Sequence, residues 1–344
     1  MTHTRLFTLA ALFAGAAQLS GAQAVDPTGA GATFPNPIYQ KWFNTYATKT
    51  SIRINYQSIG SGGGIRQLSE QTVDFGATDG PMSDDELGKA KGGRVMHVPT
   101  VIGAVAVTYN VPGLTEPLKL DAGAVTDLFL GKIKKWNDGR IAKLNPGVHL
   151  PDKAVLAVHR AEASGTTYIF TDYLATVSKE WLAGPGRGKE VQWPVGLGGK
   201  GNEGVAGQVR QLAGSVGYVE LAYARQNKLA YAAIKNSSGN FVLPSVEAAT
   251  AAAEGVAAKL SPKSDYRVSI VNASGAQAYP ISSFTWIILY QNQTDVDKGK
   301  KLVDFLKWAL TTGQADAPSL DYAPLPSTIA QRLVERLATV KVGM

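Results

Sequence analysis

The chain has 344 residues, no cysteine and a formal net charge of +7 at pH 7. Without cysteine, the protein has no disulfide, no thiolate metal site and no cysteine for a lipid anchor. Its lysines and arginines are scattered rather than arranged in a basic stripe with stacking aromatics, which argues against a nucleic-acid partner and is compatible with attraction of a small anion.

The first residues have the pattern of a secretory signal. Arg5 supplies positive charge, Leu6 to Ala17 is apolar, and Ala22-Gln23-Ala24 matches a small-x-small cleavage site. We therefore expect residues 1–24 to be a cleaved signal peptide and the mature protein to work in the periplasm. The remaining chain is longer than one hydrophobic core normally serves, so two domains are expected.

The first part of the mature chain alternates short strands, small-residue loops and helices. Helix starts and glycine loops present backbone N–H groups that suit an anion, although flexible loops and a turn-forming aspartate are the plain alternatives. The predicted features are a loop over 28–35, a helix over 36–49 with core aromatics, a strand over 52–58, a glycine loop over 59–64, a helix over 65–70, a strand over 73–79 and a capping box at Ser83–Glu86.

Two long β-prone stretches stand out in the rest of the chain, at 95–109 and 281–290. Their apolar density predicts buried strands that cross between domains. Strands alternate with helices on both sides of these stretches, which indicates α/β domains. The other predicted helices cover 124–131, 136–144, 246–260, 300–311 and 327–340, and the other strands cover 154–158, 215–218 and 231–235.

The stretch from His159 to Thr167 combines an arginine with a helix start. The strand over 154–158 delivers Arg160 to its carboxyl end, where ligands bind in open α/β sheets. Ser164-Gly165-Thr166 then caps a helix whose free N–H groups form an anion site, and the guanidinium of Arg160 matches a phosphate or carboxylate. The alternative is a helix cap beside a surface arginine.

A glycine run at Gly196–Gly201 matches G-x-G-x-x-G, with Glu220 following at the spacing of a dinucleotide site. Pro194 interrupts the preceding strand, and we expect no ordinary βαβ unit around the run. Lys200 is followed by Gly201 rather than Ser or Thr, so the run also fails the P-loop pattern. We predict no cofactor here.

Taken together, these loops resemble the phosphate-binding protein of bacterial phosphate-specific ABC transporters. The resemblance spans residues 28 to 325 and rests on several motifs in order. These are Gly29-Ala-Gly-Ala-Thr-Phe-Pro35, Ile59-Gly-Ser-Gly-Gly-Gly64, Val73-Asp-Phe-Gly-Ala-Thr-Asp79, Leu130-Gly-Lys-Ile-Lys-Lys-Trp136, Ser164-Gly-Thr166, Gly196-Leu-Gly-Gly-Lys-Gly201 and Leu320-Asp-Tyr-Ala-Pro-Leu325.

The resemblance implies a two-domain α/β periplasmic binding protein of type II, with two interdomain crossings and the ligand in the cleft. The implied crossings lie near 103–107 and 279–283. Domain I then comprises 25–104 and 283–344, and domain II comprises 105–282. The implied function is high-affinity binding of inorganic phosphate, without catalysis, and delivery to the membrane permease subunits of an ABC importer, by a monomer.

The resemblance also implies which residues contact phosphate. Arg160 is the guanidinium ligand, and Glu162 orients it from the position where the family typically has Asp. Asp79 matches the family's cleft aspartate. The implied ligand-binding residues are Ala32, Thr33, Phe34, Ser61, Asp79, Arg160, Ser164, Gly165 and Thr166.

A sensory or scavenging role without a transporter remains open from the sequence, and so do two alternative activities. One is a phosphate-ester hydrolase on the same scaffold, although no H-E-x-x-H or Asp/His cluster indicates a metal site, and Ser61 lacks a nucleophile elbow because Ile59 replaces its first glycine. The other is a binder of another oxyanion, with arsenate the closest mimic because it is protonated like phosphate. Asp79 argues against fully ionised sulfate, which has no proton to donate to a carboxylate.

Overall fold

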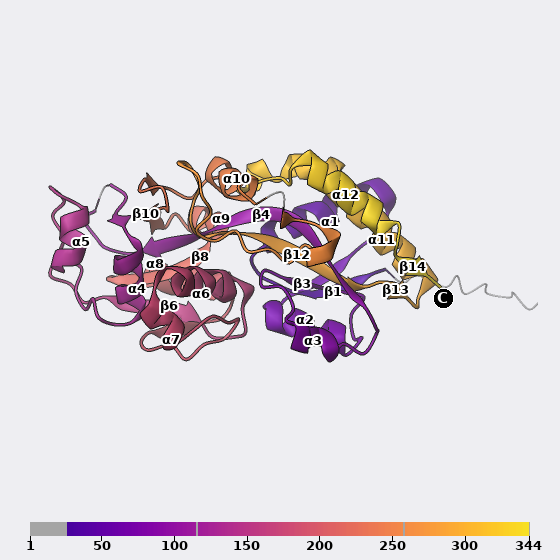
Figure 1. Ribbon diagram of the computed structural model, residues 1–344, viewed down its shortest axis with the longest axis horizontal. Helices are drawn as coiled ribbons and strands as arrows, with labels where there is room; N and C mark the ends of the chain where they lie inside the picture. The colour runs from indigo at the N-terminus through magenta and orange to yellow at the C-terminus, as the bar shows by residue number, and fades with distance from the viewer. Residues whose placement is uncertain (1–25, 115, 257–258, 344) are drawn as a thin grey trace, which may run out of the picture.

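The chain folds into two α/β lobes that share two long strands, β4 (Val95–Tyr109) and β12 (Ser282–Tyr290) (Figure 1). The structure is a computed structural model that describes residues 26–114, 116–256 and 259–343. Within these ranges nine strands form one continuous sheet, ordered β2-β1-β3-β12-β4-β8-β6-β7 with β9 beside β4. Every residue of β4 and β12 is buried, which confirms the two predicted buried strands. The predicted signal peptide lies outside the described residues.

The first lobe is built on the parallel strands β1, β2 and β3, with β12 antiparallel to β3. Helices α1 and α11 lie on one face of this sheet and α2 and α3 on the other (Figure 1). The predicted core aromatics of α1 are buried, and the ring of Phe43 lies 5.3 Å from that of Phe305 in α11. The elements are β1 (Thr28–Gly31), α1 (Asn36–Thr50), β2 (Asn55–Ser58), α2 (Ser61–Ser69), β3 (Phe75–Thr78), α3 (Asp84–Gly88), β13 (Asn292–Gln293), α11 (Val296–Leu310), α12 (Ser327–Leu337) and β14 (Lys341–Val342).

The second lobe is built on the parallel strands β6, β7 and β8, with β4 antiparallel to β8. A small sheet, ordered β11-β10-β5, adds to this lobe. Its elements are β5 (Lys119–Leu120), α4 (Ala122–Phe129), α5 (Gly139–Leu144), β6 (Leu156–Arg160), α6 (Gly165–Val177), α7 (Lys179–Ala183), β7 (Leu197–Gly199), α8 (Gly201–Gln211), β8 (Ser215–Glu220), α9 (Leu221–Gln226), β9 (Ala230–Tyr231), β10 (Ala233–Lys235), β11 (Phe241–Val242) and α10 (Val246–Glu254).

The strand β4 changes partner part of the way along its length. Its residues up to Ala104 pair with β12, and those from Val105 onward pair with β8. At the changeover, the N–H of Val105 donates to the carbonyl of Ile281 at 2.8 Å. One strand therefore belongs to both lobes, and the lobes are connected where β4 and β12 meet.

Several predicted elements differ at their ends. The helix predicted over 65–70 begins at Ser61, because Gly60 adopts a φ of 93° that turns the chain directly from β2 into α2. The strand predicted over 231–235 divides into β9 and β10, which pair with β4 and β5. The helix predicted over 246–260 is α10, which ends at Glu254.

The glycine run at 196–201 contains β7 and the first residue of α8, and α8 leads to β8. β7 and β8 are both parallel to β6, which lies between them. The expectation that no βαβ unit surrounds this run is therefore wrong. The run forms the first strand of that unit and the turn into its helix, and it lies beside the site described below.

A segment that precedes β12 packs against the first lobe. Nδ1 of His97 in β4 lies 2.7 Å from Oδ2 of Asp265, and Arg336 of α12 contacts the same carboxylate. The indole N–H of Trp286 donates to the carbonyl of Tyr266 at 3.0 Å. The same segment also contacts α6 of the second lobe, because Ser269 Oγ donates to Oδ2 of Asp172 at 2.6 Å.

Candidate functional site

Arg160 is the last residue of β6, and its side chain is buried. Its Nε donates to Oε1 of Glu162 at 3.0 Å, and Nη2 contacts the same oxygen. Its Nη1 donates to Oγ1 of Thr166 at 3.1 Å. Each terminal nitrogen carries a second N–H, which none of these contacts uses. The guanidinium is therefore fixed in orientation and retains donors for a ligand.

Glu162 orients Arg160 as the resemblance implies. Its Oε1 also accepts a hydrogen bond from the N–H of Gly201, at 3.1 Å, so it connects the arginine to the start of α8. Its Oε2 is buried and has no hydrogen-bond partner among the described residues. The longer carboxylate of Glu therefore reaches both Arg160 and the glycine run through one oxygen.

The helix α6 begins at the predicted cap. Ser164 Oγ accepts a hydrogen bond from the N–H of Thr167 at 3.1 Å, and Ser164, Gly165 and Thr166 are buried. The hydroxyl of Thr167 pairs with that of Tyr218 on β8, which also accepts from the N–H of Arg160. The helix start and the arginine are thus held against the same sheet.

The first lobe contributes residues from three loops. Thr33 and Phe34 follow β1, Ser61 begins α2, and Asp79 follows β3. All four are buried, as is Ala32. The N–H of Ala32 donates to the carbonyl of Ala77, and its carbonyl accepts from the hydroxyl of Tyr56. Ala32 therefore shapes the loop rather than offering a free backbone donor.

Asp79 is buried and forms hydrogen bonds with the hydroxyls of Thr285 and Ser61. Oγ1 of Thr285 on β12 donates to Asp79 Oδ1 at 2.8 Å, and the N–H of Asp79 donates to Ser61 Oγ at 3.2 Å. Burial raises the pKa of Asp79 to about 7, against the opposing effects of the Thr285 hydroxyl, the charge of Arg160 and Ser61. The group therefore titrates near neutral pH.

The two sets of residues meet face to face between the lobes. A Cβ built on Gly165 would lie 2.4 Å from Ser61 Oγ and 2.5 Å from Asp79 Oδ2. The N–H of Gly62 donates to the carbonyl of Ala163 at 3.0 Å. The structure thus brings all the predicted site residues to one place, in a closed arrangement of the lobes.

Asn202 links the two lobes inside the site, and sequence reasoning missed it. Its Nδ2 lies 2.8 Å from Thr33 Oγ1 and 3.2 Å from Thr166 Oγ1, and its Oδ1 accepts from the N–H of Glu220 at 2.9 Å. The signal was present, since Asn202 directly follows the glycine run. Thr285 was also missed, because a threonine in a buried strand carries no local sign of function.

Two further tyrosines hold the first loop. The hydroxyl of Tyr223 donates to the carbonyl of Thr33 at 2.6 Å, and that of Tyr322 donates to the carbonyl of Phe34 at 2.6 Å. Tyr322 also contacts the buried carboxyl of Glu220 at 3.1 Å, and burial holds the pKa of Glu220 well above its ordinary value. Glu220 therefore belongs to a buried support for the loop and does not face a nucleotide ribose.

The histidines His159 and His97 make structural contacts. The ring of His159 stacks on Trp193 with centroids 4.8 Å apart, and its Nδ1 contacts the carbonyl of Arg160. His97 is buried against Asp265, and desolvation lowers its pKa. Neither makes a hydrogen bond to Ser61 or Ser164 in the described part of the chain. In the same residues, no group of three or more His, Cys, Asp or Glu is placed to hold a metal ion.

A small cavity of about 210 Å³ adjoins the site on the side of Glu162 and Lys200. It is lined by residues of both lobes, including Thr33, Ser58 and Gly201. The cavity places the site close to the outside of the closed cleft.

Among the described helices, none is long and apolar enough to cross a membrane.

Comparison with known proteins agrees with this geometry. The family model of the PBP superfamily domain matches residues 17–312. The phosphate-binding protein PstS of Pasteurella multocida is 45% identical over 330 residues, covering 96% of this chain and 94% of its own. The protein of the same name from Haemophilus influenzae is 43% identical over 319 residues, covering 92% and 94%. That of Methanocaldococcus jannaschii is 40% identical over 323 residues, covering 88% and 82%.

Solved structures share the fold. A high-affinity periplasmic phosphate-binding protein, PfluDING, bound with phosphate, superposes with a TM-score of 0.71 at 21% identity, over 90% of this chain and 93% of its own. A phosphate-binding protein from Stenotrophomonas maltophilia gives 0.71 at 20% identity, over 91% and 94%. These similarities confirm the predicted two-domain α/β binding-protein fold.

Two lobes on shared strands, with a polar site enclosed between them, define a substrate-binding protein of the PBP superfamily. Within that superfamily, the chain belongs to the PstS family of phosphate-binding proteins.

Proposed function

We propose that this protein binds one inorganic phosphate ion between its lobes and delivers it to an ABC-type importer. The observation that carries the proposal is that the hydroxyl oxygens of the site already accept hydrogen bonds from the protein. The oxygens of Thr33, Ser61, Ser164 and Thr166 each accept a hydrogen bond from a protein N–H. A hydroxyl has one donor and two acceptor sites. Each therefore keeps its own proton to donate to an anion.

Charge compensation comes from Arg160 and the helix starts. The site encloses one cation whose unused N–H groups match phosphate oxygens. The N-terminus of α6, a helix of 13 residues, and that of α2 add partial positive charge. Because Glu162 neutralises part of the arginine charge, hydrogen bonding carries much of the recognition. We assign the ligand contacts to Thr33, Phe34, Ser61, Asp79, Arg160, Ser164, Gly165 and Thr166, with Glu162 behind Arg160 and with Ala32 shaping the first loop through its own hydrogen bonds.

Asp79 gives the site its selectivity. Thr285 occupies Oδ1, and Oδ2 faces the start of α6. Phosphate at neutral pH retains a proton that Oδ2 accepts, whereas sulfate has none and would place two negative charges together. Sites built on such a hydrogen bond reject an isostere by roughly 10⁴-fold or more, through a repulsive element against the wrong ligand.

We assign the domains as 25–104 with 283–344, and 105–282. The change of partner of β4 between Ala104 and Val105 supports this division. The segment around Tyr266 is the exception, since it packs on the first domain although it belongs to the second in chain order. Because donors come from both domains, ligand favours the closed form by hinge motion.

The proposal places the protein in the periplasm as a monomer, after removal of residues 1–24, with permease subunits as its membrane partners and no nucleic acid. The names of the relatives support the phosphate-binding role, and a solved protein of the same fold is described as periplasmic. A hydrolase on this scaffold is not supported, because among the described residues no histidine is hydrogen-bonded to Ser61 or Ser164, and the relatives compared are named as binding proteins. Arsenate remains the competing ligand because it shares the proton that Asp79 requires.

Isothermal titration of the ligand-stripped protein tests the function, with phosphate, sulfate and arsenate as separate ligands. We expect saturable binding of one phosphate per chain and no heat with sulfate. In Asp79→Asn, sulfate rejection should weaken more than phosphate binding. Absence of phosphate binding in a second method as well would overturn the proposal, and unchanged selectivity in Asp79→Asn would remove the selector role.

A further inference from the structure

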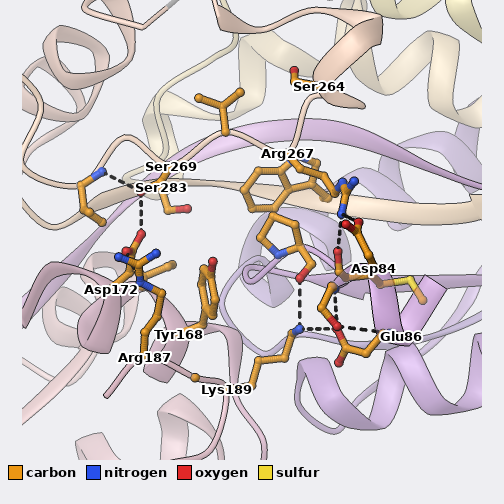
Figure 2. Close-up of a pocket in the computed structure, with 18 of the residues that line it drawn as sticks. Asp84, Glu86, Tyr168, Asp172, Arg187, Lys189, Ser264, Arg267, Ser269 and Ser283 are labelled. Carbon is orange, nitrogen blue, oxygen red and sulfur yellow. Dashed lines mark hydrogen bonds and ion pairs between the residues drawn. The ribbon is translucent and has the colours of Figure 1, made fainter. Parts of the chain in front are cut away.

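Lys189 of the second lobe reaches across the cleft to the first lobe (Figure 2). Its Nζ lies 2.8 Å from Oε2 of Glu86 and donates to the carbonyl of Pro81 at 3.1 Å. The side chains of Lys189 and Glu86 are only 12% and 30% exposed. The pair is therefore partly shielded from water, where an ion pair is worth more than on an open surface.

Both ends of this contact are tied to the phosphate site. The backbone carbonyl of Lys189 accepts the N–H of Ser164, the cap of α6, at 2.8 Å. On the other side, Pro81 lies two residues after Asp79. Glu86 is the capping-box residue of α3, and its Oε2 also accepts the N–H of Ser83 at 2.8 Å. The contact thus joins the two backbone segments that carry the selector and the helix start.

Lys189 borders a groove of about 840 Å³ between the lobes, together with Arg187 and Asp172. The other ion pairs that line the same groove are placed differently, since Arg267 pairs with Asp84 of α3 at 3.0 Å but belongs to the segment that packs on the first lobe. Arg187 pairs with Asp172 at 2.7 Å, and both belong to the second lobe. Figure 2 shows the Lys189 ammonium directed away from this pair and toward Glu86, and its Nζ lies 5.8 Å from the centre of the Tyr168 ring. Lys189 is therefore the cation of this group that joins α6 to α3.

We propose that Lys189 and Glu86 form a clasp that stabilises the closed cleft and slows the release of phosphate, an inference that rests on the proposed function. The contact spans the lobes and exists only when they are together. It lowers the free energy of the closed form and leaves the open form unchanged. The clasp therefore changes the dissociation rate of phosphate and leaves the association rate nearly unchanged, because the ligand enters the open form. Lys189 is a positioning residue and does not touch the anion.

Two substitutions remove the clasp with opposite changes of charge. Lys189→Met keeps the stem and the carbonyl that binds Ser164. Glu86→Gln keeps an oxygen for the capping box. If Lys189 acted only through its electrostatic field, losing the cation would weaken anion binding and losing the carboxylate would strengthen it. A clasp predicts that both variants bind phosphate more weakly.

The matched control is Lys132→Met. Lys132 pairs with Glu180 inside the second lobe, with side chains 44% and 59% exposed. This substitution removes the same charge and a comparable ion pair without touching the interface between the lobes. It sets the baseline for a loss of one positive charge.

Stopped-flow and titration measurements test the clasp. We expect the phosphate dissociation rate and Kd to rise about tenfold in Lys189→Met and in Glu86→Gln, with the association rate within about twofold of wild type. The double variant should be no weaker than either single variant, because both remove the same contact. Rates equal to those of Lys132→Met, or opposite shifts in the two variants, would overturn the clasp.

Small-angle scattering of the ligand-free proteins separates the clasp from the proposed function. We expect both variants to be more extended than Lys132→Met and wild type, since the closed form loses a stabilising contact. This readout needs no phosphate, so it tests the clasp even if titration shows that the wild type does not bind the ion. Identical scattering in all four proteins would contradict the clasp.

Discussion

Asp79 is the residue at which stability and ligand selectivity oppose each other. In the proposed function Asp79 must be ionised to accept a proton from phosphate, yet its side chain is 1% exposed. Thr285 and Ser61 lower the cost of the charge without removing it, which leaves the pKa at about 7. The site therefore keeps a buried carboxyl, although an uncharged side chain at this position would make the folded protein more stable.

The pH dependence of stability tests this account. Because burial raises the pKa of Asp79 in the folded protein to about 7, above the ordinary value of 3.8 for an aspartate, the folded state holds a proton between these pH values that the unfolded state has lost. The contribution of Asp79 to the free energy of unfolding is largest below about pH 4. It declines as the pH rises to about 7 and does not change further above that pH. Asp79→Asn keeps the acceptor for Thr285 and should remove the decline.

We expect phosphate-free Asp79→Asn to match wild type near pH 4 and to exceed its free energy of unfolding above pH 7, by at most about 4 kcal/mol. Urea unfolding at several pH values measures this difference. A constant difference between the two proteins across the range would show that Asp79 is not the titrating group.

At the scale of elements, the site is the meeting of two helix starts from different lobes. The close approach of α2 and α6 depends on small residues, because a Cβ on Gly165 would overlap Ser61 and Asp79 of the opposite lobe. Gly165 itself is the first residue of α6, where alanine is acceptable to the helix. The glycine is therefore required by the contact between lobes rather than by its own helix.

Gly165→Ala should prevent full closure while leaving each lobe folded. Overpacking of this kind costs roughly 1–3 kcal/mol, so we expect phosphate affinity to fall about 10- to 100-fold with little change in the melting temperature of the ligand-free protein. Titration and thermal unfolding measure the two effects. The control is Gly207→Ala in α8, where an added Cβ meets nothing within 4 Å. Equal affinities in the two variants would exclude the steric account.

At the scale of the whole molecule, β4 and β12 form a buried spine along which the lobes are arranged (Figure 1). The two strands pair over the length of β12, so their backbone groups are satisfied within the sheet. Closure therefore changes the contacts between the lobes, such as that of Gly62 with Ala163, while the spine keeps its hydrogen bonds.

Hydrogen exchange distinguishes the spine from the cleft. Over minutes, phosphate should slow exchange at residues 60–64 and 164–167 by about tenfold or more, because closure and ligand bury these N–H groups. The amides of β4 and β12 should remain unexchanged in both forms, and sulfate should change neither set. Equal slowing across both lobes would instead indicate general stabilisation without a closing cleft.

Much of this protein was predictable from its sequence. The buried strand over Val95–Tyr109, the capping box at Ser83–Glu86 and the cap at Ser164 all have the predicted form. These features depend on apolar runs and on hydrogen bonds between residues three positions apart, which a sequence displays directly. The residues predicted for the site also lie together, because each follows a strand or begins a helix.

The tertiary structure decided which distant groups meet. Asn202 joins Thr33 across 169 positions, Thr285 reaches Asp79 across 206, and Lys189 reaches Glu86 across 103. Nothing near these residues in the chain marks their partners, since polar side chains are usually solvated. The order of strands in the sheet fixes these contacts, and burial then makes each one costly to leave unpaired. The sequence thus determined the elements and the donors, whereas the closed packing of the lobes determined the supports of the site and the clasp across it.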